Sequence, residues 1–578
     1  MPDNMNTLDT DILILGAGGA GLFAALHAKK ANPDLDVTIA VKGLLGKCGC
    51  TRMVQGGYNV ALAKEDSIER HFMDTIEGGA WLNDQDLAWL LVTTAPVRIR
   101  ELENELGCFF DRNPDGTIHQ KAFAGQTFDR TVHKGDLTGI EIINRLAEQV
   151  WRRNVRRLED YRAIDLIPAA DGSGLAGVFM LDMRTGEPLF VRARATLLAT
   201  GGGPTMYKYH TPSGDKACDG MAMALRAGLP LRDIEMVQFH PTGLLAGEGT
   251  RMTGTVLEEG LRGAGGYLTD STGERFMFKY DPRGERATRD IVSRSIQDRI
   301  RAGFASPHGG VYIEMGHLGP AKVAHDFKGM VERCADCGFD LAGGRVEVVP
   351  TAHYMMGGVV FAPDCTTPMP RLFAAGEDTG GVHGANRLGG NGVANSTVFG
   401  GLAGDSMAAG TSRSTALADP DAAALERARA RAFAPFGRPR GDLSAVREKL
   451  YDIMWNEVGI LRTADTLARG AAALDALARD VADSGVADTD RRYNLTWMDR
   501  LNLENLILVS RAICVAATAR VDSRGAHFRE DFPAASDLAT SRYTLTRLAG
   551  DEPGLTVETA PVVFTRVRPG ESLIEKAA

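Results

Sequence analysis

Three short segments of the sequence place ionisable side chains among glycines. His240 lies in Gln-Phe-His-Pro-Thr-Gly, His353 in Pro-Thr-Ala-His-Tyr-Met-Met-Gly-Gly, and Arg387 in Val-His-Gly-Ala-Asn-Arg-Leu-Gly-Gly-Asn. A hydrophobic core needs none of this chemistry. Two histidines and an arginine that converge from separate segments would bind an anionic, carboxylate-bearing substrate.

A further group of charged residues lies between the first two of these segments. Glu258, Glu259 and Arg262 fall within one turn if Thr253–Arg262 is a helix, which is the structure we predict there. Such spacing is also typical of a solvated ion-pair face. The surroundings favour a site instead, because the group follows His240 closely and precedes a glycine-rich turn.

The N-terminal residues have the pattern of a nucleotide-binding βαβ unit. Asp11–Leu15 is an apolar run of strand length, residues 22–30 read as a helix, and Val37–Val41 supplies a second strand. Between the first strand and the helix, residues 16–21 read Gly-Ala-Gly-Gly-Ala-Gly. In this context the glycines predict a phosphate-binding turn.

Each glycine of this turn has a physical task. Gly16 makes the tight turn, Gly18 admits a pyrophosphate at the helix N-terminus, and Gly21 lets the helix pack on the strand. Gly19 lies beside them as a further predicted cofactor contact. Lys42 stands at the end of the second strand, where a plain NAD site usually has an acidic ribose ligand. The sequence therefore argues against NAD.

The composition excludes several classes of function. The 578 residues are 44% hydrophobic and 24% charged, as in an ordinary globular protein. The net charge of −9 gives no support for nucleic-acid or membrane-surface binding. No window reaches the roughly 18 apolar residues of a membrane span. The polar N-terminus lacks a basic region, so we expect a cytoplasmic location.

The cysteines indicate neither a disulfide scaffold nor a metal site. The eight cysteines are too sparse for a scaffold in a chain of this length. Cys334 and Cys337 form a lone CxxC without a second pair at metal-binding spacing. Cys48 and Cys50 contain no iron–sulfur pattern either. We predict no metal site in this chain.

Taken together and in the same order, from Asp11 to Asp531, these segments resemble the flavoprotein subunit of succinate dehydrogenase and fumarate reductase. The resemblance implies an α/β fold: a doubly wound Rossmann-type FAD-binding domain, an inserted α+β capping domain and a C-terminal helical domain. The expected ranges are 1–235 and 350–415 for the FAD-binding domain, 236–349 for the capping domain, 416–540 for the helical domain and 541–578 for a C-terminal tail.

The resemblance also implies FAD as the cofactor. The implied contacts beyond the first glycine cluster are Lys42, Cys50, Thr51, Gln55, Gly56, Gly57, Thr200, Gly201, Asp219, Glu377, Arg387, Gly392 and Val393. Many members bond FAD covalently through a histidine, and Cys50 stands in that place here. We therefore expect non-covalent FAD, with a thioether through Cys50 as the alternative.

Catalytic roles follow from the same resemblance. Arg289 matches the arginine that transfers the proton at the substrate carbon, and Glu259 and Arg262 match the relay behind it. Arginine is a poor acid in water, because its pKa exceeds about 12. It can serve only if neighbouring groups reload it at once, which is the task of the relay.

Substrate contacts are implied as well. His240, His353 and Arg387 match the residues that hold the substrate carboxylates, so that a dicarboxylate presents its C–C unit for hydride transfer. Phe123 lies in a Lys-Ala-Phe-Ala-Gly-Gln segment that resembles the pocket loop of succinate and fumarate enzymes. The related L-aspartate oxidases usually have a Glu-Gly-Gly-His type of loop. The expected reaction is interconversion of a saturated and an unsaturated carboxylic acid, succinate/fumarate-type.

Glu258 departs from the family, which has a threonine there that helps to hold one substrate carboxylate. Two carboxylates about 4 Å apart repel by several kcal/mol in a partly buried site. Glu258 therefore turns toward Arg262, is protonated, or faces a donor group on the substrate. The last case leaves open an L-aspartate oxidase-like amino-acid oxidase, or a dehydrogenase for a modified dicarboxylate.

Two further expectations concern the class of protein and its partner in electron transfer. A non-catalytic electron-transfer module is disfavoured, because it would leave Arg289, Glu259, His353 and Arg387 superfluous. If electrons leave the flavin for an iron–sulfur cluster, that cluster belongs to another polypeptide. Through such a partner the chain would be peripheral at the inner membrane.

Overall fold

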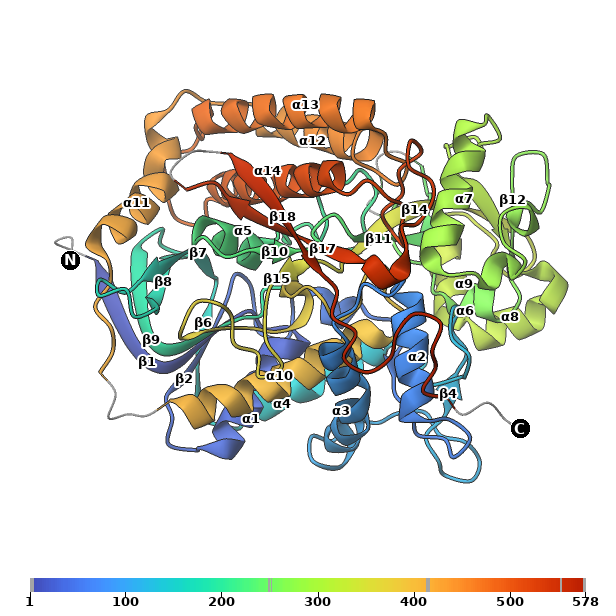
Figure 1. Ribbon diagram of the computed structural model, residues 1–578, viewed down its shortest axis with the longest axis horizontal. Helices are drawn as coiled ribbons and strands as arrows, with labels where there is room; N and C mark the ends of the chain where they lie inside the picture. Colours follow the sequence, from blue (N-terminus) through green and yellow to red (C-terminus); the bar gives the residue numbers. More distant parts are fainter. Residues whose placement is uncertain (1–4, 248–249, 251, 412–415, 551–553, 575–578) are drawn as a thin grey trace.

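The computed structural model describes residues 5–247, 250, 252–411, 416–550 and 554–574. Residues 1–4 of the polar N-terminus and 412–415 of the Ala- and Arg-rich stretch after α10 lie outside the described residues. The largest sheet has seven strands in the order β6-β2-β1-β9-β8-β7, with β16 paired to β9 (Figure 1). Their bounds are β1 Asn6–Leu15, β2 Val37–Val41, β6 Val155–Glu159, β7 Tyr161–Pro168, β8 Leu175–Asp182, β9 Pro188–Leu198 and β16 Leu372–Ala374.

The central strands of this sheet are parallel and buried. Ile12 of β1 lies opposite Val37 of β2 on one side and Ala195 of β9 on the other. Strands buried on both faces are nearly continuous apolar runs, which is why the Asp11–Leu15 pattern predicted β1 correctly. Parallel pairing brings the carboxyl ends of β1, β2, β9 and β16 to one edge, where ligands of such sheets bind.

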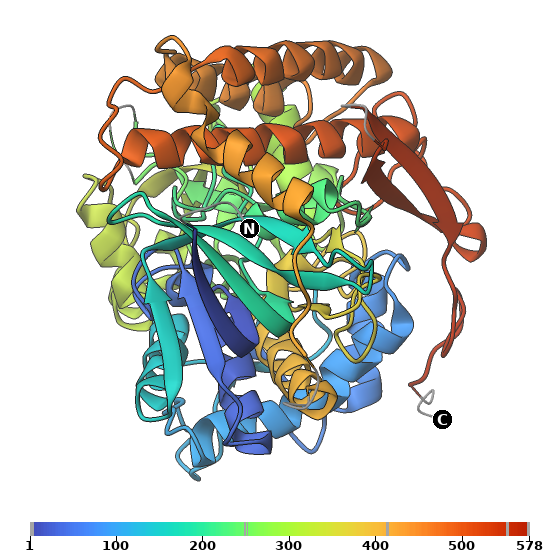
Figure 2. The ribbon, with the colours of Figure 1, turned by 90° about the vertical axis from the view of Figure 1, so that its left-hand side faces the viewer.

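Helices α1 (Gly19–Ala31) and α10 (Asn391–Gly410) lie against each other along this sheet. A Cβ on Gly400 would come within 2.5 Å of the Ala20 carbonyl oxygen, so the two helices approach backbone to backbone. Figure 2 shows these blue and gold helices on one side of the sheet and the orange and red helices of the C-terminal half on the other. The close packing places the N-termini of α1 and α10 side by side.

The remaining elements of this part are α2 Ile68–Gly78, α3 Gln85–Asn104, α4 Thr138–Trp151, α5 Asp219–Arg226, β3 Tyr58–Asn59, β4 Gln120–Lys121 and β5 Thr131–Val132.

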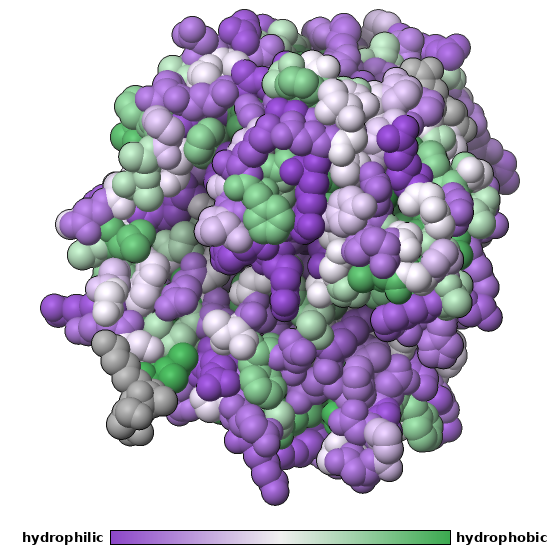
Figure 3. Space-filling view, turned by 90° about the vertical axis from the view of Figure 1, so that its right-hand side faces the viewer, coloured by the Kyte–Doolittle hydropathy of each residue, from purple (hydrophilic) through white to green (hydrophobic). Residues whose placement is uncertain are grey.

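The segment predicted as the cap builds its own sheet and core. Its four strands have the order β11-β14-β13-β12, and its buried hydrophobic residues from Leu244 to Val348 form a separate cluster. The surface on this side of the molecule is largely hydrophilic, with hydrophobic residues scattered over it (Figure 3). The bounds are β11 Val237–Leu244, β12 Tyr267–Thr269, β13 Val311–Glu314, β14 Arg345–Met355, α6 Gly260–Gly263, α7 Arg289–Arg301, α8 Pro320–Asp326 and α9 Lys328–Ala335.

The C-terminal third is helical and ends in a hairpin. Its helices are α11 Ala422–Phe433, α12 Leu443–Asn456, α13 Ala464–Asp483 and α14 Leu495–Ala519. The range expected as a tail instead contains the hairpin strands β17 (Arg542–Leu548) and β18 (Leu555–Pro561). They extend a four-stranded sheet with β10 (Leu231–Arg232) and β15 (Gly358–Val359). The chain end is thus tied back to the FAD-binding part, because β17 pairs with β10.

The sequence-based expectation that no segment is apolar enough for a membrane span was wrong by length and composition: helix α14 is long and apolar enough, the one such helix among the described residues. The window that meets this test is 72% buried inside the fold. Leu503, Val509 and Ile513 are completely buried, and Asn505 binds Asp219 across the interface. The apolar residues of α14 are therefore accounted for by packing within this chain.

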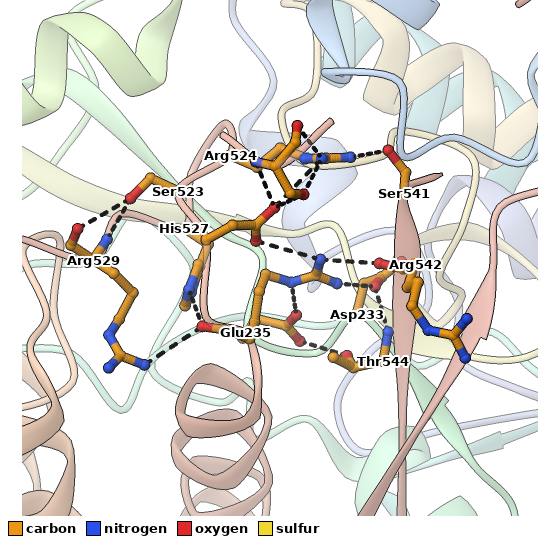
Figure 4. A network of polar contacts seen from close by, with 12 residues as sticks. Asp233, Glu235, Ser523, Arg524, His527, Arg529, Ser541, Arg542 and Thr544 are labelled. Carbon is orange, nitrogen blue, oxygen red and sulfur yellow. Dashed lines mark hydrogen bonds and ion pairs between the residues drawn. The ribbon is translucent and has the colours of Figure 1, made fainter. Parts of the chain in front are cut away.

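A buried charge network joins the FAD-binding part, α14 and the hairpin. Arg520, at the end of α14, lies 2.6 Å from Glu235 Oε1 and 2.9 Å from Asp233 Oδ1. Thr544 of β17 donates its backbone N–H to Asp233 at 3.0 Å and its hydroxyl to Glu235 at 2.8 Å. Figure 4 shows both carboxylates facing this strand. Because all members are buried, each charge depends on its partners.

Arg520→Met should destabilise the protein by about 3–5 kcal/mol, since it leaves the buried Glu235 without its cation and Asp233 with only the longer contact, 3.4 Å, to Arg232. Arg469→Met is the matched control, because Arg469 forms an exposed pair with Glu457 and should cost at most about 1 kcal/mol. Urea unfolding of both variants with the wild type measures the difference. Equal shifts of the two midpoints would contradict the role given to Arg520.

Candidate active site

A cavity of about 590 Å³ lies between the glycine-rich loops of the large sheet and the cap. Of the predicted site residues, only Gly21 and Arg262 do not line it. The lining residues among those predicted are Gly16, Gly18, Gly19, Lys42, Cys50, Thr51, Gln55, Gly56, Gly57, Phe123, Thr200, Gly201, Asp219, His240, Glu258, Glu259, Arg289, His353, Glu377, Arg387, Gly392 and Val393. Residues spread over most of the chain thus meet in one cavity.

The turn between β1 and α1 is built on backbone contacts that leave no room for side chains. Gly16 has φ +109°, and a Cβ there would lie 2.1 Å from the Ala199 carbonyl oxygen. A Cβ on Gly21 would lie 2.0 Å from the Gly16 carbonyl oxygen, so Gly21 serves helix packing and not the cavity. At Gly18 the nearest atom to an added Cβ would be Thr51 Oγ1, at 3.5 Å. The N-terminus of α1 is therefore open to the cavity, as a pyrophosphate site requires.

The lysine at the end of β2 is held by an ion pair. Lys42 Nζ lies 2.6 Å from Asp219 Oδ2, and the other Asp219 oxygen accepts from Asn505 at 2.7 Å and Arg162 at 3.0 Å. Burial alone would raise the pKa of Asp219, but the Lys42 and Arg162 charges lower it below its usual range. Asp219, at the start of α5, thus places a carboxylate beside the end of β2, and both members of the pair line the cavity.

Burial raises the pKa of two ionisable residues that line the cavity. Cys50 opens a short 3₁₀ helix, and burial raises the pKa of its thiol to about 12. Glu377 Oε1 accepts from the backbone N–H groups of Met355 at 3.0 Å and Gly203 at 3.3 Å. Burial raises the pKa of Glu377 to about 7.

Arg289, the first residue of α7, is fixed by two partners. Its guanidinium lies 2.7 Å from Glu259 Oε2, and its Nη1 donates to Gln238 Oε1 at 3.0 Å. Glu259 Oε1 in turn accepts from Arg262 Nη2 at 2.9 Å, and Arg262 Nη1 donates to the Glu285 carbonyl oxygen at 2.6 Å. Burial alone would raise the pKa of Glu259, but the guanidinium groups of Arg289 and Arg262 lower it. The result is a continuous buried chain of hydrogen bonds.

The two histidines lie side by side on paired strands of the cap. The ring centroids of His240 (β11) and His353 (β14) are 5.5 Å apart. Thr211 Oγ1 lies 2.8 Å from His353 Nδ1 and orients that ring. Burial and the charge of Arg289 lower the pKa of both histidines well below the ordinary value. Both rings are therefore neutral at physiological pH and can donate hydrogen bonds without adding charge.

Arg387 is a buried cation with few partners. Its side chain lies 4.4 Å from the Tyr354 ring centroid, and its only hydrogen bond among the described residues is a long one, 3.4 Å, to the Leu388 carbonyl oxygen. Within the same described part of the chain, its Nε has no hydrogen-bond partner. Burial and the nearby Arg289 lower the pKa of Arg387 to about 10. A buried guanidinium in this state calls for an anionic ligand.

Glu258 forms an ion pair with a residue that the spacing of charges along the sequence does not predict. Its Oε2 lies 3.1 Å from Lys121 Nζ, in the loop that also carries Phe123. Arg262, one of the alternatives considered for Glu258, pairs with Glu259 instead. Glu258 still lines the cavity and is 5% exposed. Its negative charge is balanced from the FAD-binding part rather than from within the cap.

The predicted helix Thr253–Arg262 is wrong for most of its length. Only Gly260–Gly263 is helical, and the preceding residues run beside β11. Val256 forms a bridge with Gly243, and the Leu257 N–H donates to the Thr242 carbonyl oxygen at 2.9 Å. The β-branched residues and Gly254, whose φ is +90°, favour this extended path.

Several residues with clear contacts at the site were missed from the sequence. Gln238 and Tyr354 lie inside the segments that drew attention to His240 and His353, so their positions were a usable signal. Thr211 and Arg333 also line the cavity, and nothing in their local sequence marks them. Among the described residues, no group of three His, Cys, Asp or Glu side chains could hold a metal ion.

Comparison with known proteins identifies the family. Residues 11–393 match the family described as FAD binding domain, and residues 447–573 match the one described as fumarate reductase flavoprotein C-term. The chain is 40% identical to one subunit of the CoM/CoB fumarate reductase of Methanothermobacter marburgensis, covering 91% of this chain and 95% of that protein. It is 34% identical to the Escherichia coli fumarate reductase flavoprotein subunit, covering 91% and 89%.

Solved structures agree with these matches. A variant of FrdA from the Escherichia coli quinol fumarate reductase superposes with a TM-score of 0.91 at 31% identity, covering 99% of this chain and 100% of that one. Mycobacterium smegmatis Sdh1 in complex with UQ1 gives a TM-score of 0.86 at 34% identity, covering 98% and 96%. The fold class and the FAD cofactor predicted from the sequence are confirmed. The chain belongs to the family of fumarate reductase and succinate dehydrogenase flavoprotein subunits, and it is an FAD-dependent oxidoreductase that acts on a CH–CH bond.

Proposed function

We propose that this protein interconverts succinate and fumarate, using Arg289 to transfer the proton. The observation that carries the proposal is the buried chain from Arg289 through Glu259 to Arg262, opening on a cavity that also contains Arg387. Such a chain has no purpose in a flavin-binding module without proton chemistry. FAD, when bound, supplies the acceptor or donor of the hydride.

The residues that would hold FAD fit its parts. Gly16, Gly18 and Gly19 form the open end of α1 for the pyrophosphate. Lys42 and Asp219 offer polar contacts at the end of β2. The N-terminal residues of α10, Gly392 and Val393, and the loop with Gln55, Gly56 and Gly57 line the same cavity as the two histidines.

Substrate binding rests on excess positive charge. Arg387 has no carboxylate within ion-pair distance among the described residues, and Arg289 shares Glu259 with Arg262. A dianion entering the cavity would meet these guanidinium groups and two neutral histidines that donate hydrogen bonds. Clamped at both carboxylates, the substrate would be fixed with its C–C unit next to Arg289.

The proton path explains how an arginine can act as an acid. Arg289 gives its proton to the substrate carbon only if Glu259 replaces it with one from Arg262. The distances of 2.7 Å and 2.9 Å along this path are those of charge-assisted hydrogen bonds. Glu259 is 2% exposed and Arg262 1% exposed. This burial keeps bulk water from exchanging protons with the two groups during the transfer.

The pairing of Glu258 with Lys121 weakens the case for an amino-acid oxidase. That alternative needed a carboxylate left for a substrate amine, and Lys121 already occupies one oxygen of Glu258 at 3.1 Å. The same pairing removes most of the repulsion that Glu258 would exert on a dicarboxylate. Succinate and fumarate are therefore favoured over an amino acid.

The electron partner is proposed from composition and from relatives. The cysteines Cys48 and Cys50 lie near the cavity without a cluster motif. Several relatives carry names of subunits, including a quinol-linked fumarate reductase flavoprotein subunit of Wolinella succinogenes. We propose that a separate iron–sulfur polypeptide takes or delivers the electrons, with this chain cytoplasmic or peripheral at the inner membrane through that partner.

Arg289→Lys should bind FAD normally but lose at least about a hundredfold in turnover, as expected for a lost acid–base group. The assay follows the flavin band near about 450 nm while succinate reduces the oxidised protein or fumarate reoxidises the reduced one. Arg283→Lys, an exposed change near the start of the same helix, is the control. Reduction by aspartate but not succinate in the wild type would overturn the proposed function, and near-normal turnover in Arg289→Lys would remove Arg289 from it.

Glu258→Thr should lower the KM for succinate and fumarate by about tenfold, because it removes a negative charge from the cavity and leaves Lys121 to attract the substrate. Lys121→Met should do the opposite and raise KM, since Glu258 then lacks its balancing charge. Steady-state kinetics of both variants test this. If KM is unchanged in both, the charge of Glu258 does not reach the substrate.

FAD should be bound without a covalent link, because burial raises the pKa of Cys50 to about 12 and keeps it as the unreactive thiol. Acid precipitation of the holoprotein should release all yellow colour into the supernatant, in the wild type and in Cys50→Ser alike. Flavin fluorescence that stays with the denatured wild-type chain on a gel, and disappears in Cys50→Ser, would show the thioether instead.

A further inference from the structure

We infer that Arg333, on helix α9 of the cap, is a further ligand of a substrate carboxylate and a determinant of dicarboxylate specificity. The inference rests on the proposed function, since it assumes a dicarboxylate in this cavity. No sequence motif marks Arg333, and it contributes to neither the proton path nor the Arg387 site. It is nevertheless a half-buried cation that lines the same cavity.

The contacts of Arg333 leave its charge without a counterion in the described part of the chain. Its Nη1 donates to the Val256 carbonyl oxygen at 2.9 Å. With the Gln55 amide oxygen turned toward the cap, that oxygen accepts from both terminal nitrogens of Arg333, at 3.0 Å for Nη2, and the amide nitrogen donates to the Val256 carbonyl oxygen at 3.3 Å. Among the described residues no carboxylate lies within ion-pair distance of Arg333. Its partners are thus neutral groups, which orient a guanidinium but do not balance it.

Arg333 lies on the wall of the cavity that the Gln55 loop and the segment before Glu258 form. Gln55 belongs to the loop that continues through Gly56 and Gly57, beside Phe123. Val256, which holds Arg333, is two residues from Glu258, the residue that replaces the threonine expected to hold a carboxylate. The cap wall therefore loses a hydroxyl donor at position 258 and has a guanidinium close by. Because Lys121 balances the charge of Glu258, Arg333 is the cation that remains on this wall to bind a substrate carboxylate.

The cavity then has a guanidinium group from each of the two parts of the chain that line it. Arg387, over the Tyr354 ring, offers a partly satisfied guanidinium from the FAD-binding part. Arg333 offers one from the cap. A dicarboxylate can engage both, whereas a monocarboxylate can engage only one of them. Because Arg333 also contacts Gln55 across the boundary between cap and FAD-binding part, a bound carboxylate would draw the two parts together.

Arg333→Gln should raise the KM for fumarate about 10- to 100-fold, the loss expected for one charge-assisted contact, with kcat changed less than about threefold. Binding of malonate, followed by the change in the flavin spectrum, should weaken by the same factor. Binding of acetate, which has one carboxylate, should change less than about threefold. Arg333→Lys should recover part of the malonate affinity, because it restores the charge without the fork of donors.

Lys328→Gln, which removes the same charge from an exposed position on the same helix, is the control and should behave as the wild type. Unchanged malonate affinity in Arg333→Gln would overturn the inference, and so would an equal loss for malonate and acetate, which indicates disturbed packing. A wild type that binds malonate through Arg333 but turns over neither succinate nor fumarate would leave the inference standing and sink the proposed function.

Discussion

Positive charge buried in and beside the cavity is the constraint on which the rest of the site depends. Arg262, Arg289 and Arg387 are at most 6% exposed, and Glu259 pairs with only two of them. Removing guanidinium groups from water is costly, so the surrounding structure must supply hydrogen bonds and leave the remaining charge to a ligand. Burial and the same charge lower the pKa of the two histidines and keep them neutral, because an imidazolium beside Arg289 would add to the repulsion. The arrangement of the buried arginines, more than any single one of them, determines which ligands the cavity can bind.

The fold holds these cations by tying distant segments to one another. Strands β11 and β14 pair with irregularities between Gln238 and Phe239 and between His240 and Gly243, on either side of His240, which lines the cavity. Helix α7 begins at Arg289, so its first residue is fixed by the helix that follows. The loop with Arg387 is backed by the C-terminal part, where the Ala526 N–H donates to the Ala385 carbonyl oxygen at 2.8 Å. The helical third therefore supports the site without lining it.

The sequence predicted correctly those elements whose structure depends mainly on residues close to one another in the chain. The βαβ unit from Asp11 to Val41 was predictable, because a buried parallel strand and a glycine turn leave clear marks in the sequence. The helix expected at Thr253–Arg262 was not, because pairing with β11 overrode the charge spacing. The partner of Glu258 is separated from it by 137 residues, and no spacing rule reaches that far. Site residues were found where a resemblance named them. Arg333 and Thr211, which no motif marks, needed the three-dimensional structure.

The burial of Arg262 has a consequence for where protons come from. Its guanidinium donates to the Glu285 carbonyl oxygen, and the Glu285 carboxylate pairs with Arg275, whose side chain is 44% exposed. In the proposed proton path Arg262 is therefore the innermost group, because a backbone carbonyl oxygen accepts a hydrogen bond but does not pass a proton on to the carboxylate of its own residue. If Arg289 transfers the proton as proposed, chemistry at the substrate and reloading of the path from solvent would be separate events in time.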